Sequence, residues 1–171
     1  MFNNYQFRLA ALVIVKQPFP TVPSKHSALV DDNLVLQLLT GACVNVLSYS
    51  PVKATLVVEN NQGKGLDHKM IENDVQLLDP QTLTAKFPIT FLEGTRKNAV
   101  CLRFAMDVQV EQSGMKVSGS LEVERSSSPF VVMTNQKQWE GCERTLLLRD
   151  AFAGQVILIL SSLTLLSLSL I

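Results

Sequence analysis

The sequence has no excess of charge of either sign. Its 15 Lys and Arg side chains balance 15 Asp and Glu side chains, so the net charge is zero. Nonspecific affinity for nucleic acid comes from cations that neutralise phosphates. The balance therefore argues against a strong autonomous nucleic-acid binder, although it leaves room for a basic patch on one face.

Cysteines and glycosylation sites are also scarce. Cys43, Cys101 and Cys142 are odd in number and widely spaced, which predicts neither a disulfide framework nor a Cys-x-x-Cys metal pair. No Asn-x-Ser/Thr site occurs. Both absences favour a reducing, intracellular setting. Cys101 falls in an apparent strand, where we expect a buried and unreactive thiol.

The residue patterns of catalysis are missing as well. His26 and His68 are isolated from any carboxylate or cysteine at metal-ligand spacing. The serines at 126–128 lack the Gly-x-Ser-x-Gly elbow of hydrolases, and no Gly-x-x-x-x-Gly-Lys phosphate loop occurs. We therefore expect a protein that is not an enzyme and that uses neither a cofactor nor a metal.

What the sequence does contain is a pattern of short strands. Apolar residues make up 47% of the chain and charged residues 18%, which is typical of a folded domain. Runs rich in β-branched residues alternate with turn residues. We expect strands at residues 34–39, 43–49, 53–59, 82–87, 99–110 and 115–124, with a hairpin turn at Gln112-Ser113-Gly114 and a loop at 60–65. This pattern predicts an all-β protein, an antiparallel sandwich or barrel.

Each end of the chain carries an apolar run that has two interpretations. Residues 9–15 are either a buried strand ended by prolines or the apolar part of a signal peptide, and we favour the strand. Residues 156–171 carry no charge. They are either a membrane anchor or translated sequence beyond a splice junction at Gln155-Val156, and the sequence leaves both open.

Several motifs resemble, in order and spacing, the DNA-binding domain of the STAT (signal transducer and activator of transcription) family. Val-Ile-Val-Lys-Gln-Pro at residues 13–18 is similar to the signature that opens that domain, with Lys16 where the family has Glu. The expected strands near 34–39 and 52–57 are similar to the strand pair that follows. Ala85-Lys86-Phe87 and the later Gly94-Thr95 resemble the central strand and the loop after it.

The best match lies at residues 128–136, Ser-Pro-Phe-Val-Val-Met-Thr-Asn-Gln, which is similar to the family's Ser-Leu-Pro-Val-Val-Val-Ile-Ser/Thr-Asn run. Arg-Asp-Ala-Phe at 149–152 resembles the start of the family's linker domain, without the family's tryptophan. The resemblance implies an immunoglobulin-like β-barrel or sandwich with a short C-terminal helix. It divides the chain into an N-terminal remnant at 1–8, the barrel at 9–140, the start of a linker-type helix at 141–153 and an apolar tail at 154–171.

The resemblance also implies where DNA would be contacted. Asn135 matches a family residue that reaches a base edge in the major groove, and its amide offers both a donor and an acceptor for that purpose. The alternative is a purely structural role, in which Asn135 forms an Asx turn that closes the strand. Thr134 and Lys137 share its loop, while Arg96, Lys97 and Lys86 are candidates for phosphate contacts. The hypothesis requires the turns at 94–97 and 134–137 to meet at one end of the barrel.

Two functions follow for testing. In the first, the chain is a STAT-like DNA-binding transcription factor, a fragment or truncated isoform, acting in cytokine-type signal transduction. Its partners are duplex DNA and other STAT-type chains, and its compartments are the cytoplasm and nucleus. In the second, it is a membrane-anchored β-sandwich interaction protein that does not bind DNA and reaches the membrane through residues 156–171.

Overall fold

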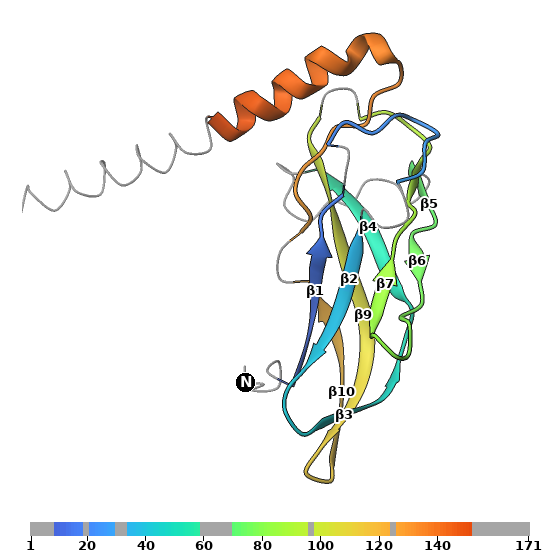
Figure 1. Ribbon diagram of the computed structural model, residues 1–171, viewed down its shortest axis with the longest axis vertical. Helices are drawn as coiled ribbons and strands as arrows, with labels where there is room; N and C mark the ends of the chain where they lie inside the picture. Colours follow the sequence, from blue (N-terminus) through green and yellow to red (C-terminus); the bar gives the residue numbers. More distant parts are fainter. Residues whose placement is uncertain are drawn as a thin grey trace, which may run out of the picture.

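Two antiparallel sheets face each other in the computed structural model, which describes residues 9–18, 21–29, 34–58, 70–95, 98–123 and 126–151 (Figure 1). The first sheet has the order β1-β2-β7, formed by β1 (Ala10–Lys16), β2 (Val35–Thr40) and β7 (Thr84–Lys86). The second has the order β10-β9-β4-β6, with β3 also paired to β9. Its strands are β3 (Val44–Tyr49), β4 (Val52–Val58), β6 (Val75–Gln76), β9 (Val100–Gln112) and β10 (Met115–Glu122).

Strand β9 is the spine of the second sheet. From Leu102 to Val110 its even-numbered residues are buried, while its odd-numbered residues are less buried or exposed, as the alternation of apolar and polar residues requires. One edge of β9 pairs with β10. The other edge pairs with β4 along residues 100–105 and with β3 along residues 108–112. Three strands of the second sheet, β3, β4 and β10, therefore all pair with this one long strand.

The core lies between the two sheets. It combines inward residues of β1, β2 and β7 with those of β4, β9 and β10. Two aromatic pairs stabilise it: Phe87 and Phe104 with ring centroids 5.1 Å apart, and Phe91 and Phe130 at 5.2 Å. The expected all-β immunoglobulin-like sandwich is confirmed. Cys101 is buried, as predicted, and its Sγ lies 3.9 Å from the carbonyl oxygen of Val57.

The strands differ from the sequence prediction mainly where they are short. The apolar run at 130–133 forms only isolated bridges, Val100 to Phe130 and Ser24 to Met133. Strands β5 (Ile71–Glu72), β6 and β8 (Thr90–Phe91) were not predicted. Each has only two residues, too few for an alternating pattern to show. The loop predicted at 60–65 lies outside the described residues.

Two turns have a clear local cause. Ser113 and Gly114 join β9 to β10 with φ values of 51° and 80°, so both central residues are left-handed, as a tight hairpin turn requires. At the turn between β6 and β7, Asp79 accepts hydrogen bonds from the backbone N–H groups of Thr82 and Gln81. These bonds hold the pKa of Asp79 below its ordinary value.

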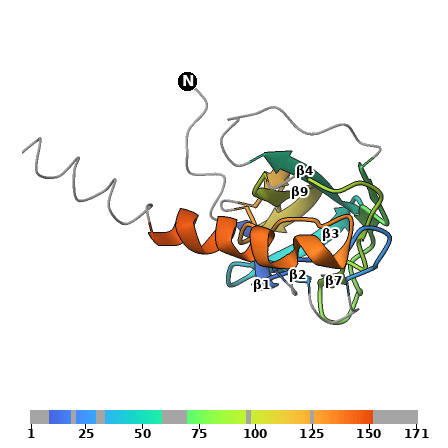
Figure 2. The same ribbon diagram turned by 90° about the horizontal axis from the view of Figure 1, so that it is seen from above.

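An α-helix begins at residue 139 and continues to 151, the last described residue. It starts two residues before the predicted boundary at 141. Figures 1 and 2 show it crossing one end of the sandwich. Cys142 and Leu146 pack there on a second small core with Val22, Val131 and Met133. The same end carries the loops at 21–29 and 92–95, and the next subsections call it the helical end of the sandwich.

The structure describes the apolar run near the N-terminus but not the one at the C-terminal end of the sequence. Residues 10–16 form β1, which confirms the strand interpretation. The N-terminal remnant at 1–8 and the tail at 154–171 lie outside the described residues. No helix within the described part of the chain is long and apolar enough to cross a bilayer.

Candidate nucleic-acid interface

The segment 134–138, here called the recognition loop, is a compact turn held by its own side chains. The backbone N–H and the hydroxyl of Thr134 both donate to Oε1 of Gln138, at 2.9 and 2.8 Å. Asn135 then adopts an extended conformation and precedes a one-turn 3-10 helix at Gln136–Gln138. All five residues of the loop are exposed. The loop therefore exposes polar side chains at the helical end, and the bonds between Thr134 and Gln138 fix its backbone.

Asn135 has its amide available for an external contact. It occupies the N-cap position of the 3-10 helix, where an Asn side chain often accepts a backbone hydrogen bond. Here its side chain makes no such bond. The Asx-turn interpretation therefore lacks the hydrogen bond that would define it, and the amide is exposed beside Lys137.

A second turn, residues 94–98, is pinned against the base of the recognition loop. The backbone N–H of Thr95 donates to the carbonyl of Val132 at 3.0 Å. The Thr95 hydroxyl accepts from the Val132 N–H at 3.1 Å and donates to the carbonyl of Asn98 at 2.8 Å. Gly94 and Thr95, the first two residues of this turn, therefore lie against the base of the recognition loop. Arg96 and Lys97, the two cations of the turn, lie outside the described residues, so their position near the loop stays a prediction.

Gly94 makes this close approach sterically possible. A Cβ atom at this position would collide with Cγ2 of Thr134 and would lie 3.1 Å from the carbonyl oxygen of Val132. A larger residue here would need the Thr134 side chain to shift and the Val132 carbonyl to give by a few tenths of an ångström, whereas Gly fits without either. Gly94 thus sets the spacing between the turn and the recognition loop.

The hydroxyl of Thr95 is expected to hold the two turns together. Replacing Thr95 with Val would leave the buried Val132 N–H without its side-chain acceptor and remove the donor to Asn98. We expect the free energy of unfolding to fall by about 1–3 kcal/mol, measured by urea denaturation. Thr95→Ser keeps the hydroxyl and serves as the control. Equal stability of both variants would show that these bonds contribute nothing.

A third segment, residues 21–26, reaches the same place, and sequence reasoning missed it. Val131 donates to the carbonyl of Thr21 at 3.1 Å and Met133 to that of Pro23 at 2.9 Å, while Lys25 donates back to Met133 at 2.8 Å. Lys25 and the exposed His26 therefore lie close to the base of the recognition loop. The prolines of this region predicted the end of a strand, but no local signal reveals a long-range parallel bridge.

Lys86 lies elsewhere. It is an exposed residue of β7 and pairs with Val35 of β2 in the first sheet. It belongs to neither of the two turns, so the structure does not bring it together with Asn135. Lys25, which sequence reasoning overlooked, takes a position nearer the recognition loop.

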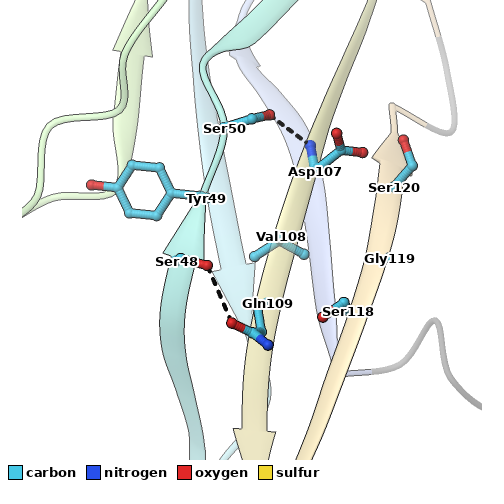
Figure 3. Close-up of a pocket in the computed structure, with 9 residues that line it drawn as sticks. All are labelled: Ser48, Tyr49, Ser50, Asp107, Val108, Gln109, Ser118, Gly119 and Ser120. Atoms are coloured by element: carbon cyan, nitrogen blue, oxygen red, sulfur yellow. Dashed lines mark hydrogen bonds between the residues drawn. The ribbon is translucent and has the colours of Figure 1, made fainter.

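The outer face of the second sheet carries a separate polar hollow of about 460 Å³ (Figure 3). The central strand β9 contributes Asp107 and Gln109, and serines flank it on both neighbours. The Ser50 hydroxyl accepts a hydrogen bond from the Asp107 N–H at 2.8 Å, and Ser48 lies 3.4 Å from Oε1 of Gln109. Among the described residues no group of three His, Cys, Asp or Glu side chains is placed to hold a metal ion.

The fold and the loop cluster define an immunoglobulin-like sandwich that presents polar loops at one end. Residues 10–133 match the family model described as the STATa immunoglobulin-like domain. The chain is 46% identical over 153 residues to signal transducer and activator of transcription B of Dictyostelium discoideum and 43% identical over 147 residues to signal transducer and activator of transcription A of the same organism. These alignments cover 84% and 85% of this chain. The chain belongs to the STAT family.

The similarity covers a small part of the relatives. The aligned region amounts to 13% of signal transducer and activator of transcription B and 20% of signal transducer and activator of transcription A. The names of both relatives describe signal transduction and activation of transcription. The comparisons thus favour the STAT interpretation over a membrane-anchored interaction protein.

Proposed function

We propose that this chain is the DNA-binding portion of a STAT-type signal transducer and transcription factor, and that it contacts duplex DNA through its helical end. The observation that carries the proposal is the exposed, uncapped amide of Asn135 on a loop braced by the 94–98 turn. Base contacts need a side chain with both donor and acceptor, and phosphate contacts need cations nearby. The helical end offers both kinds.

Each residue of the cluster has a role in this proposal. Asn135 contacts a base edge in the major groove, and Thr134 fixes the loop through its bonds to Gln138. Lys137, Arg96 and Lys97 contact phosphates, and Lys25 joins them because it is bonded to the base of the loop. Lys86 contributes only if the DNA extends along the first sheet. With so few cations we expect the isolated chain to bind weakly, with a Kd on the order of 10⁻⁴ to 10⁻⁶ M.

A selection experiment separates base contacts from phosphate contacts. A pool of randomised duplexes is bound by the wild type and by variants, and the bound DNA is sequenced. We expect Asn135→Ala to relax base preference at one position, since a bidentate pair discriminates by about 1–3 kcal/mol. The double change Arg96→Ala with Lys97→Ala should lower affinity for all sequences. It should also flatten the salt dependence of binding, by about one unit of slope for each phosphate that is no longer neutralised.

Lys53→Ala is the matched control. Lys53 is an exposed cation at one end of β4, where it pairs with Ala105. The other end of β4 is the one near the recognition loop, because Val58 pairs there with Val100, which bridges to Phe130. Lys53→Ala should leave both base preference and salt slope unchanged. Equal binding by the wild type and all of these variants would remove the DNA assignment.

The remaining parts of the proposal concern the longer protein. Residues 9–140 serve as the DNA-binding barrel, and the helix that begins at 139 is the start of a linker to the next unit. Other STAT-type chains are the expected protein partners, because two half-sites share the binding energy when two barrels are joined. The cytoplasm and the nucleus are the expected compartments.

A further inference from the structure

Strand β10 is an edge strand with an exposed outer rim. Among the described strands it pairs only with β9. Its residues from Met115 to Glu122 are exposed except for Val117 and Leu121. Strand β1 passes nearby without pairing, and a hollow of about 80 Å³ lined by Leu9, Ala10 and residues of β9 and β10 lies between them. An unpaired rim of this kind presents backbone groups that another strand can bind.

The direction of those backbone groups follows from one hydrogen bond. In an antiparallel pair, alternate residues point their N–H and C=O groups toward the partner. The N–H of Val123 donates to Phe104 of β9 at 2.9 Å. Odd-numbered residues of β10 therefore face β9, and even-numbered residues face the open rim. The rim is formed by Lys116, Ser118, Ser120 and Glu122.

The sequence of β10 is symmetric about Gly119. It reads Lys-Val-Ser-Gly-Ser-Leu-Glu from residue 116 to 122. Two such strands placed antiparallel with Gly119 at the centre would pair Ser118 with Ser120, Val117 with Leu121 and Lys116 with Glu122. The inner pairs then join side chains of the same kind, serine with serine and apolar with apolar. The outer pairs join opposite charges. The even-numbered rim residues face one another in this register, as the backbone geometry requires.

We propose that β10 pairs antiparallel with β10 of a second copy of this chain, with the two-fold axis at Gly119. The second sheets of the two copies then form one continuous sheet. Cross-strand pairs of opposite charge stabilise such a ladder, whereas like charges directly opposite destabilise it. Lys116 and Glu122 would therefore select a second copy in this one register and disfavour shifted registers.

Two features of the surface support the same arrangement. A Cβ at Gly119 would have no atom within 4 Å, so the residue on the axis leaves space on the inner face of the strand. On the outer face, Ser118 is level with Gln109 and Ser120 is level with Asp107. The serine-lined hollow of Figure 3 would then continue from one copy into the other, with small side chains at the junction. The rim residues nearest the axis, Ser118 and Ser120, have small side chains.

The first test exchanges charges and measures self-association of the full chain by sedimentation velocity over a range of concentrations. We expect Lys116→Glu to raise the Kd of the dimer by about tenfold or more, because two attractive pairs become repulsive. Glu122→Lys should do the same. The double variant should return to within about threefold of wild type, since the two changes are coupled. Glu122→Lys, which lies opposite Ala105 within its own copy, should melt with the wild type. Lys116→Glu lies opposite Glu111 and should melt slightly earlier, so the Kd of the Glu122→Lys variant is the cleaner measure. A wild type that stays monomeric, or a double variant no tighter than the single ones, would overturn the proposal.

The second test fixes the register with disulfides, in a Cys43→Ser background because Cys43 is the exposed native cysteine. Gly119→Cys places two thiols at a non-hydrogen-bonded pair, where the Cα atoms are about 4.5 Å apart and a disulfide can form. We expect a covalent dimer on mild oxidation. Ser120→Cys faces Ser118 of the other copy and should not crosslink. Equal crosslinking by both variants, or crosslinking only by Ser120→Cys, would contradict the register centred on Gly119.

Discussion

Replacement of Gly94 by Ala is expected to weaken both the fold and DNA binding, because the new methyl group would occupy the space between the 94–98 turn and the recognition loop. Cγ2 of Thr134 blocks that space on one side and the carbonyl of Val132 lies 3.1 Å away on another. Overpacking at such a site costs about 1–3 kcal/mol. The turn and the loop would have to separate, so the proposed phosphate and base contacts could no longer be made together. Urea denaturation and duplex binding measure the two effects.

Thr134→Ser provides a rescue within the same pair of residues. Serine lacks Cγ2, so the main obstacle to the methyl group disappears, while the hydroxyl still donates to Gln138. We expect the double variant to recover most of the stability and binding lost in Gly94→Ala. A double variant as weak as the single one would show that Gly94 acts through Val132 or through the flexibility of the chain. Unchanged binding in Gly94→Ala would show that the spacing of the turns does not matter for DNA.

The long strands could be predicted from the sequence because their alternation is local. Residues 100–112 alternate apolar and polar side chains over most of their length, and the expected strand at 99–110 covers nearly all of β9. The hairpin after it was predicted for the same reason, since Ser113-Gly114 suits a left-handed turn. Strands β5, β6 and β8 were missed because a strand of two residues is defined by its partner and leaves no period in the sequence.

The candidate interface was predicted only in part. Asn135 and the two turns could be proposed from a family resemblance, which placed motifs in order along the chain. The bonds that join the turns, from Thr95 to Val132, connect positions 37 residues apart and follow from no local pattern. Lys25 was missed because its place depends on a parallel bridge between Ser24 and Met133. Residue types suggest the chemistry of a site, whereas long-range backbone contacts decide which residues share it.

The largest loss of stability is expected from Phe104→Ala. Phe104 lies in the middle of β9, is 1% exposed and meets Phe87 of the facing layer edge-on at 5.1 Å. Truncating such a ring removes its buried apolar surface and leaves a cavity, at a cost of about 3–5 kcal/mol. Small domains are stable by only about 5–15 kcal/mol. The variant should therefore unfold at a much lower urea concentration, and a substantial fraction should be unfolded near physiological temperature.

Arg103→Ala is the neighbouring control. Arg103 precedes Phe104 on the same strand, but its side chain is exposed on the outer face, and surface changes of this kind usually alter stability by less than about 0.5 kcal/mol. Phe104→Leu keeps an apolar side chain in the core and should fall between the two. This order, with Ala least stable and the Arg103 variant nearest the wild type, follows from β9 burying one face and exposing the other. Equal stability of the Phe104→Ala and Arg103→Ala variants would mean that β9 does not face the core as described, and the packing that supports the helical end would need to be redrawn.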